Sequence, residues 1–497
     1  MMLTAQDLLA AIGRVWPGQP LPEALSALGE ALMLTTNSKE VVPGAVFVAV
    51  PGSQRDGRDF IDAALAAEAG LVLAHARDGE VTLEGRVLWL PHLAQRLGEL
   101  GKALFEVPDT LDVIAVTGTN GKSSVTHYIA ALSEALGVPA GVVGTLGAGR
   151  PGRLRESGLT TPGPLALQQM LGELAAEGVT RVALEASSHA LDQQRLDAVA
   201  VSAGVFTNLS RDHLDYHGSM AAYAAAKAKL FRRPELRLAV VNADDKLARL
   251  MLAGCDAEVR VLASGEDEAV TLRVLDWQAH SEGQRAMVAT PEGERMLELP
   301  LMGRFNLDNV LLAIAVLLGK GEALDALFAA AARLTPVAGR MELYTAPNCP
   351  SVVIDYAHTP DALANALEAL RAHRTGQGAL WCLFGCGGDR DTGKRAEMAK
   401  AAARYADRIV VTDDNPRSEL AEAIRQMILA GFDDTSPVSE KGDRREAIAY
   451  AIAHAQPDDV ILVAGKGHER YQEIAGVRHP YSDVDEVARA LAARRAP

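Results

Sequence analysis

Short apolar or β-branched segments alternate with Ala- and Leu-rich segments along the whole chain, and this alternation limits the fold more than any other feature. Apolar residues recur at helical spacing in segments such as 124–137 and 397–406. The alternation is typical of βαβ units, in which a helix connects two parallel strands. It predicts an α/β fold with strands at residues 46–50, 111–118, 181–187, 203–209, 236–242, 351–357, 379–385, 407–413 and 459–465.

The length of the chain predicts several domains, because 497 residues are too many for one hydrophobic core. Two junctions interrupt the alternation. One is the segment FEVPDT, and the other is LTPVAGRMEL, where Pro and Gly end a helical pattern. We therefore expect domains at residues 1–107, 108–335 and 336–497. With 48% hydrophobic residues, the chain can form a core in each of them.

The charge and the cysteines exclude several classes of protein. The chain has 64 acidic and 49 basic residues, and its net charge of -15 argues against a general affinity for nucleic acid or anionic membranes. Cys255, Cys349, Cys382 and Cys386 are too few and too scattered for a disulfide framework, which favours a reducing cytoplasm. Cys382 and Cys386 lack the CxxC spacing of zinc sites, so we expect them to be small core residues.

Neither a signal peptide nor a membrane span is predicted. The N-terminus carries Asp7 and lacks a basic region followed by a long apolar segment. The longest apolar segment, residues 310–319, is far shorter than the roughly 20 residues that cross a bilayer. We expect a soluble protein without membrane insertion.

A glycine-containing loop between a strand and a helix is the strongest local signal. The strand at 111–118 leads into a loop that ends in Lys-Ser, and a helical pattern follows at once. Such a loop turns its backbone N–H groups toward a phosphate, while its lysine adds a positive charge and its serine can bind Mg²⁺. The spacing is GxxGKS, two residues shorter than the standard motif. It predicts binding of ATP or GTP at Gly118, Thr119, Asn120, Gly121, Lys122, Ser123 and Ser124.

Acidic and histidine residues follow two further predicted strands. Glu185 comes at the end of the strand at 181–187, and the strand at 203–209 is followed by Asp212, His213 and Asp215. Ligands bind at the carboxyl ends of strands in open α/β sheets, and a carboxylate there suits a Mg²⁺-nucleotide site. We therefore expect Glu185 and His213 to lie near the glycine loop.

An ordered series of motifs resembles the Mur ligase family, in its diaminopimelate-adding type. The motifs are TGTNGKSS, TTPG, EASSHALDQQR, TNLSRDHLDYH, YAAAKAKLF, GRFNLDN, GRME, DYAHTPDAL, GCGGDRDTGKR, DDNPR and GKGHERYQ. They run from about residue 36 to residue 472 and so cover nearly the whole chain. The resemblance implies an N-terminal UDP-binding α/β domain, a central P-loop ATPase-like domain with a parallel sheet, and a C-terminal Rossmann-like α/β domain.

The resemblance also implies an activity: ATP-dependent amide formation in bacterial peptidoglycan synthesis. The γ-phosphate of ATP would pass to the D-Glu carboxylate of UDP-N-acetylmuramoyl-L-alanyl-D-glutamate, giving an acyl phosphate that the amine of meso-diaminopimelate attacks. Lys122 would steady the phosphates. Ser123 and Glu185 would hold one Mg²⁺, and His213 would help to hold a second. Lys227, four residues after Tyr223, matches a lysine that CO₂ converts to a metal-binding carbamate in this family; we choose it over Lys229.

The substrate contacts are implied by the same resemblance. Further ATP contacts fall on Asn306, Arg340 and Asp355. The UDP-sugar dipeptide would bind Thr36, Ser38, Ser53, Gln54, Arg55, Thr160, Thr161, Ser187, Gln193 and Arg195. Diaminopimelate would bind Arg390, Asp414, Asn415, Pro416, Arg417, Gly465 and Glu469. Two positions depart from the common pattern, because Ala338 replaces a proline before GRME and Lys39 replaces an arginine near the UDP pocket.

Three alternatives remain at this stage: an L-lysine-adding ligase, a folylpolyglutamate synthase, and a non-catalytic P-loop binding protein. Arg417 speaks against the first, because a guanidinium can bind the distal carboxylate that lysine lacks. The match to a UDP pocket speaks against the second. The presence of Glu185, His213 and Lys227 in one chain speaks against the third. We expect a monomer that acts on small molecules.

Overall fold

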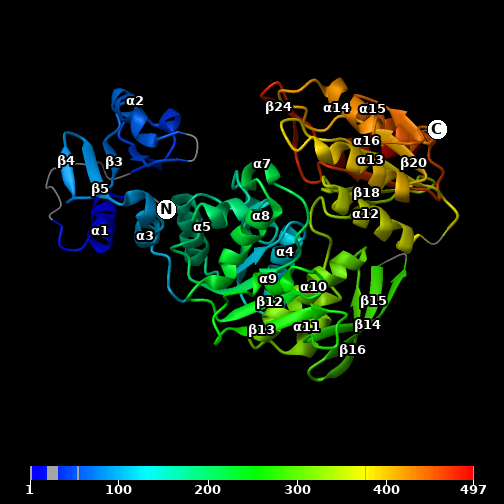
Figure 1. Ribbon diagram of the computed structural model, residues 1–497, viewed down its shortest axis with the longest axis horizontal. Coiled ribbons are helices and arrows are strands. Elements are labelled where there is room, and N and C mark those ends of the chain that lie inside the picture. Colours follow the sequence, from blue (N-terminus) through cyan, green and yellow to red (C-terminus); the bar gives the residue numbers. More distant parts are fainter. Residues whose placement is uncertain (1–2, 20–31, 53–54, 281–282, 375, 496–497) are drawn as a thin grey trace.

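The computed structural model describes residues 3–19, 32–52, 55–280, 283–374 and 376–495. Three large sheets follow one another along the chain, and a two-stranded hairpin lies after the last of them (Figure 1). All nine segments predicted to be strands overlap a strand of one of these sheets. The predicted α/β fold class is confirmed.

The first sheet has the strand order β1-β2-β3-β5-β4. β1 to β3 and β5 are parallel, and β4 is antiparallel to β5. One face packs on α1 (Ala5–Val15) and α3 (Leu93–Leu104), and the other on α2 (Ile61–Ala66). The strands are β1 (Leu34–Thr35), β2 (Val46–Ala49), β3 (Leu71–Ala76), β4 (Thr82–Glu84) and β5 (Val87–Pro91).

The central sheet has eleven strands in the order β16-β15-β14-β13-β12-β11-β6-β10-β7-β8-β9. Its parallel core consists of β6 (Asp112–Thr117), β7 (Ala140–Gly144), β10 (Arg181–Glu185), β11 (Val201–Phe206), β12 (Leu238–Asn242) and β13 (Arg260–Gly265). The antiparallel strands β8 (Gly147–Arg150) and β9 (Arg153–Arg155) extend one end. At the other end β14 (Leu272–His280) runs parallel to β13, and β15 (Gly283–Thr290) and β16 (Gly293–Leu299) follow it in antiparallel pairs.

Helices cover both faces of the central sheet. One face packs on α4 (Lys122–Ala135), α10 (Arg304–Gly319) and α11 (Leu324–Ala331). The other packs on α5 (Pro164–Ala176), α6 (Ser188–Asp192), α8 (Met220–Ala228) and α9 (Ala248–Met251), and α7 (Leu214–His217) precedes α8. The apolar segment 310–319 lies in α10, where it is a core helix. Within the described ranges, no helix is long and apolar enough to cross a bilayer.

The third sheet has the order β17-β18-β22-β19-β20-β21, parallel except for β17. Its strands are β17 (Glu342–Tyr344), β18 (Ser351–Asp355), β19 (Leu380–Phe384), β20 (Arg408–Val411), β21 (Val438–Glu440) and β22 (Val460–Ala464). One face packs on α12 (Pro360–His373), α13 (Gly393–Tyr405) and α14 (Ala421–Leu429). The other packs on α15 (Arg444–His454) and α16 (Asp483–Arg495), and β23 (Tyr471–Ile474) pairs with β24 (Val477–Pro480).

Cys382 and Cys386 are buried in the core of the third sheet, and neither forms a disulfide. Cys386 Sγ contacts Met398 Sδ at 3.5 Å. Burial raises the pKa of the Cys386 thiol to about 12, so it stays protonated near neutral pH. The prediction that both cysteines are small core residues is confirmed.

Candidate active site

The glycine loop joins β6 to α4 and requires glycine at two positions. Gly118 has a φ of 152° and Gly121 a φ of 83°, both in the region that favours glycine. A Cβ at position 118 would lie 1.9 Å from Thr207 Oγ1, and one at position 121 would lie 2.5 Å from Asn309 Oδ1. The loop therefore has a tightly packed backbone that ends at the N-terminus of α4, as an anion-binding loop requires.

Lys122 is the first residue of α4, and its ammonium group folds back over the loop. Its Nζ donates to the carbonyl oxygens of Gly118 at 3.0 Å and Thr119 at 2.9 Å. Burial lowers the pKa of Lys122, although the charge of Glu185 opposes this change. The cation thus lies above the loop, where it can meet a phosphate.

Glu185 ends β10 and meets the helix that follows the glycine loop. Its carboxylate accepts hydrogen bonds from Ser123 Oγ at 2.8 Å and from Thr145 N at 2.9 Å and Thr145 Oγ1 at 3.1 Å. The contact arises because β10 lies between β6 and β7, so the segments that follow all three strands converge at one edge. The structure brings the predicted pair Ser123 and Glu185 together and adds Thr145.

Lys227 lies in α8 and reaches the same loop from the other side. It is 1% exposed, and its Nζ donates to Gly118 O at 2.6 Å. Its Nζ also lies 4.5 Å from the ring centroid of Tyr223, one helical turn earlier. Burial, with a further contribution from Lys122, lowers the pKa of Lys227 well below its ordinary value. Lys229 differs, because it is half-exposed and forms an ion pair with Asp192 at 2.7 Å.

His213 follows β11 and faces the same edge of the sheet. Its Nε2 lies 3.4 Å from Asp212 Oδ2, and its ring packs edge-on against His189 with centroids 4.9 Å apart. Burial lowers the pKa of His213 to about 4, and the charges of Lys122 and Lys227 contribute to the shift. The imidazole is therefore neutral near pH 7 and has a nitrogen lone pair that can bind a metal.

The five residues predicted to bind the muramoyl dipeptide form a network beside Glu185. Thr161 Oγ1 donates to Glu185 O at 2.6 Å and accepts from Ser187 N at 3.0 Å. Arg195 Nη1 donates to Thr161 O at 2.6 Å, and its Nη2 donates to Gln193 Oε1 at 2.6 Å. Thr145 Oγ1 lies 3.0 Å from Thr160 Oγ1, so the two hydroxyls are within hydrogen-bond distance. The network consists of Thr160, Thr161, Ser187, Gln193 and Arg195.

Arg340 connects the third sheet to the nucleotide loop. Its Nη2 lies 3.4 Å from Ser123 Oγ, and its guanidinium lies 4.5 Å from the ring centroid of Tyr356. The Nε of Arg340 is buried without a hydrogen-bond partner in the structure. A guanidinium with a free donor beside the loop lysine is suited to an anionic ligand.

The other two predicted ATP residues have their polar groups engaged elsewhere. Asp355 ends β18 and accepts from Met341 N and Ala357 N, each at 2.8 Å. Asn306 is 2% exposed; Tyr128 OH donates to its Oδ1 at 3.1 Å. Its Nδ2 donates to Met302 O at 2.8 Å. Both residues therefore stabilise their surroundings before any ligand binds.

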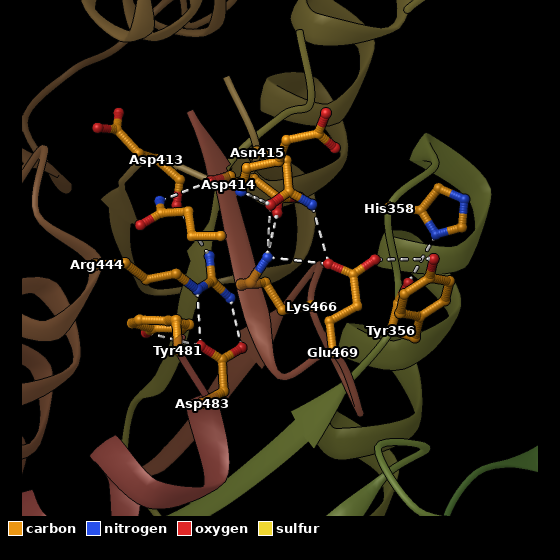
Figure 2. Close-up of polar contacts among 12 residues, drawn as sticks. Tyr356, His358, Asp413, Asp414, Asn415, Arg444, Lys466, Glu469, Tyr481 and Asp483 are labelled. Atoms are coloured by element: carbon orange, nitrogen blue, oxygen red, sulfur yellow. Dashed lines mark hydrogen bonds and ion pairs between the residues drawn. The ribbon is translucent and has the colours of Figure 1, made fainter. Parts of the chain in front are cut away.

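The residues predicted to bind the diamino acid gather beyond β19, β20 and β22. Asn415 Nδ2 donates to Glu469 Oε2 at 2.9 Å, and Figure 2 shows these residues with Asp414 around Lys466. A Cβ on Gly465 would lie 3.1 Å from Asp414 Oδ2. The glycine therefore allows the two segments to approach closely.

The two predicted recognition arginines lie next to each other across Gly387. A Cβ there would lie 2.8 Å from Arg417 Nη1 and 3.8 Å from Arg390 Cγ. Arg417 Nη1 donates to Gly388 O at 2.8 Å, and a Cβ on Gly388 would lie 2.0 Å from Pro416 O. The loop after β19 and the loop after β20 thus form one unit that carries two guanidinium groups.

The predicted UDP residues lie apart from this site. Thr36 and Ser38 follow β1, and Arg55 follows β2. Figure 1 shows the first sheet at one end of the molecule, away from α4. Ser53 and Gln54 are outside the described residues. The structure brings the other predicted residues to the central and third sheets but leaves these on the first.

Sequence reasoning missed Thr145, Lys466 and the pair formed by Arg395 and Glu419. Arg395 donates to both carboxylate oxygens of Glu419, at 2.9 and 2.7 Å, and Glu419 Oε1 also accepts from Asp389 N at 2.7 Å. This pair connects the loops of Arg390 and Arg417. Lys466 could have been found, because it stands between Gly465 and Glu469 in a motif already chosen.

A buried ion pair behind this cluster predicts a large loss of stability. Arg444 and Asp483 are fully buried and joined by two hydrogen bonds of 2.8 Å, and Arg444 Nη2 also donates to Ala464 O at 2.8 Å. We expect Arg444→Met to lower the free energy of unfolding of the third sheet by about 3–5 kcal/mol, because Asp483 would remain buried without a cation.

Hydrogen exchange of the β22 amides would measure this loss locally. The control is Arg445→Met, because Arg445 is exposed and its contact with Glu486 is 3.4 Å long. We expect the control to change stability by less than about 1 kcal/mol. Equal protection of β22 in both variants would show that the buried pair contributes little.

Family models match three successive parts of the chain. The model described as Mur ligase family, catalytic domain matches residues 31–104. Those described as Mur ligase middle domain and Mur ligase, glutamate ligase domain match residues 116–317 and 339–467. The chain belongs to the Mur ligase family.

Individual relatives are similar over almost their full length. A protein of Pseudomonas aeruginosa named UDP-N-acetylmuramoyl-L-alanyl-D-glutamate--2,6-diaminopimelate ligase is 48% identical, with 93% of this chain and 96% of the relative covered. A solved structure of a protein with the same name is 36% identical, covers 100% of both chains and has a TM-score of 0.68. The MurF ligase of Thermotoga maritima in complex with ADP, 19% identical over 95% of this chain and 99% of its own, has a TM-score of 0.65 and shows the fold alone.

Proposed function

We propose that this chain is an ATP-dependent ligase that joins meso-2,6-diaminopimelate to the D-Glu carboxylate of UDP-N-acetylmuramoyl-L-alanyl-D-glutamate, as a monomer in the bacterial cytoplasm. One observation carries most weight. The contact of Arg340 with Ser123 joins the nucleotide loop to the sheet that carries Arg390 and Arg417. A ligase needs this proximity, because activated acid and incoming amine must meet. The names of relatives up to 48% identical support the same substrates.

The nucleotide contacts follow from the loop and from Arg340. The amides of residues 118–124 bind the phosphates of ATP, with Lys122 as a point charge above the loop. The unpartnered Nε of Arg340 adds a donor from the third sheet. Asn306 binds near the adenine and Asp355 near the ribose, which requires each to exchange or share a hydrogen bond that it makes in this structure.

The donor set fits Mg²⁺. Ser123 Oγ and Glu185 Oε1 are oxygen donors 2.8 Å apart, and neutral His213 offers a nitrogen. In the part of the chain that the structure describes, no group of three or more His, Cys, Asp or Glu side chains is arranged so that it could hold a metal ion by itself. We propose one Mg²⁺ at Ser123 and Glu185 and a second at His213. Bound metal would neutralise charge on the transferring phosphoryl group.

Lys227 completes the donor set as a carbamate. CO₂ adds to a neutral amine, with loss of one proton, and the low pKa of Lys227 favours that neutral form. The product keeps one N–H, which can still donate to Gly118 O. The carbamate supplies anionic oxygen, the kind of ligand that Mg²⁺ prefers.

Phosphoryl transfer then requires the D-Glu carboxylate oxygen in line with the γ-phosphorus of ATP. The oxygen–phosphorus bond of the acyl phosphate forms as the bond to ADP breaks. The free amine of the diamino acid attacks the acyl carbon and loses a proton, and inorganic phosphate leaves. Lys122 and Arg340 stabilise the charge on the phosphoryl oxygens.

The two remaining substrates bind on opposite sides of this centre. Thr160, Thr161, Ser187, Gln193 and Arg195 hold the muramoyl dipeptide, while Thr36, Ser38, Ser53, Gln54 and Arg55 hold its uridine diphosphate end. Arg390 and Arg417 bind the distal carboxylate of diaminopimelate, and Glu469 binds its distal ammonium, on the loop formed with Asp414, Asn415, Pro416 and Gly465.

The three sheets support a division into domains. We propose a UDP-sugar domain at 1–107, an ATP-binding domain at 108–335 and an amino-acid domain at 336–497. Each range contains one complete large sheet. Arg340 stands five residues into the third range, so a movement of that domain would open or close the nucleotide site.

A phosphate-release assay tests the proposed reaction. Purified protein is given ATP, Mg²⁺, UDP-N-acetylmuramoyl-L-alanyl-D-glutamate and meso-diaminopimelate, and each component is omitted in turn. We expect phosphate release only in the complete mixture, because the acyl phosphate forms from ATP and the D-Glu carboxylate and inorganic phosphate leaves when the amine attacks it. Release that does not depend on the amine, or no release, would contradict the proposal.

A further inference from the structure

Lys466 is a buried cation in the third sheet that none of the assigned roles uses. It follows β22 and is 0% exposed. Its Nζ donates to Asn415 Oδ1 at 2.9 Å and Glu469 Oε2 at 3.0 Å, and it lies 3.4 Å from Asp414 Oδ1 (Figure 2). All three partners belong to the proposed diaminopimelate site. A fully buried lysine needs such partners, because an unpaired buried charge is strongly unfavourable.

The contacts of Lys466 join two segments that the sheet itself keeps apart. Residues 413–417 follow β20 and residues 465–475 follow β22, and β19 lies between these strands. β20 and β22 therefore do not pair with each other, and the two segments meet only beyond the strand ends, where Arg417 and Ile474 form an isolated parallel bridge. The side chain of Asn415 connects them together with Lys466, because its Oδ1 also accepts from Glu473 N at 2.9 Å.

The same connection fixes the backbone of Arg417. Arg417 N donates to Glu473 O at 3.0 Å, and Ala475 N donates to Arg417 O at 2.7 Å. Arg417 has a φ of 51°, a conformation that a non-glycine residue adopts only when its surroundings hold it there. The recognition loop is therefore held by its neighbour segment, and Lys466 contributes to that contact through Asn415, two residues before Arg417.

The charges around Lys466 do not balance. Asp414 and Glu469 are two carboxylates beside one ammonium, whereas the neighbouring pair of Arg444 and Asp483 is neutral. Burial raises the pKa of Asp414, but Lys466 and Arg444 more than offset this and hold it below the usual range. The cluster therefore carries one negative charge that a second ammonium group would neutralise.

We propose that Lys466 is a positioning residue for the diamino acid. It holds the Glu469 carboxylate and the segment from Asp414 to Arg417 in one arrangement. The distal ammonium and carboxylate of the substrate then meet binding groups that are already positioned. The incoming ammonium balances the charge of the cluster. This inference rests on the proposed function, and it concerns affinity for the amine rather than the chemistry at the phosphate.

The test replaces Lys466 with methionine, which keeps length and apolar volume and removes the charge. We expect the KM for diaminopimelate to rise at least tenfold, because the loop and Glu469 lose their common partner. The KM values for ATP and the UDP-sugar dipeptide, and kcat at saturating amine, should stay within threefold. Lys466→Arg, which keeps the charge, should recover part of the affinity.

The matched control is Lys441→Met. Lys441 also follows a parallel strand of the third sheet and packs on a tyrosine ring, with its Nζ 4.9 Å from the centroid of Tyr450. We expect the control to leave the KM for diaminopimelate unchanged. A similar rise in the KM values of all three substrates after Lys466→Met would overturn the positioning role.

Two further measurements, the stability of the variants and the activity of the wild-type enzyme, distinguish a folding defect from a loss of the positioning role. Circular dichroism and β22 hydrogen exchange show whether Lys466→Met folds, and Lys466→Gln serves as a second uncharged variant. If neither variant nor Lys466→Arg folds, the residue is structural and the proposal is wrong. A wild-type enzyme that does not use diaminopimelate would overturn the proposed function, whereas wild-type use with unchanged KM in Lys466→Met would overturn this inference alone.

Discussion

Replacing Lys227 with alanine is expected to reduce the rate of amide formation roughly 100-fold or more, the scale seen when one preorganised charged group is lost from an active site. Lys227 is 1% exposed, its Nζ lies 2.6 Å from Gly118 O, and its pKa is lowered by burial. These properties favour the neutral amine that reacts with CO₂. The alanine variant would lack the anionic oxygen that the proposed carbamate supplies.

Chemical rescue distinguishes the carbamate from a structural lysine. A short carboxylate such as formate or acetate can enter the space left by Lys227→Ala and restore part of the activity, measured as phosphate release. The control is Lys229→Ala, because Lys229 is two residues away, half-exposed and paired with Asp192. Unchanged kinetics of Lys227→Ala, or activity that no carboxylate restores, would contradict the role of the carbamate.

Replacing Arg417 with alanine is expected to raise the KM for diaminopimelate by about 100-fold, because the distal carboxylate would lose a charge-assisted pair of hydrogen bonds. ATP binding should change less than threefold, since the nucleotide loop lies on the central sheet. Arg417→Lys should recover only part of the loss, because an ammonium group cannot form the two parallel hydrogen bonds of a guanidinium.

The control for Arg417 is Arg408→Ala. Arg408 is exposed and lies at the other end of β20, so its loss leaves the recognition loop intact. Isothermal titration with a non-hydrolysable ATP analogue measures nucleotide binding independently of the amine. Equal losses of ATP binding and amine affinity in Arg417→Ala would mean that the loop has a structural rather than a recognition role.

Nine of the parallel strands could be predicted from the sequence because most of their residues are buried, whereas β3, β5, β7 and β13, which are also parallel, were missed. β6, β10 and β22 therefore read as continuous apolar segments. The strands β14 to β16, which form two successive antiparallel pairs, were also missed, because their outward side chains interrupt the apolar pattern. Strands of this kind can be identified only from the strands with which they pair in the structure.

The residues of the candidate site divide in the same way. Some could be predicted from their neighbours in the chain, and others depend on contacts between distant segments. The glycine loop could be predicted because its strand, glycines, lysine and helix are contiguous in the chain. The contact of Arg340 with Ser123 spans 217 residues and depends on how two sheets meet. Lys466 was missed because lysines are rarely fully buried, so a single lysine in a loop motif suggests a surface residue.

A competition between two amines tests the central claim most directly. The wild-type protein receives ATP, Mg²⁺, UDP-N-acetylmuramoyl-L-alanyl-D-glutamate and equimolar meso-diaminopimelate and L-lysine, and mass spectrometry identifies the tripeptide product. We expect the diaminopimelate product to predominate, because L-lysine lacks the distal carboxylate that we propose Arg417 and Arg390 bind. A product that contains mainly L-lysine, or consumption of ATP without either tripeptide, would contradict the assignment.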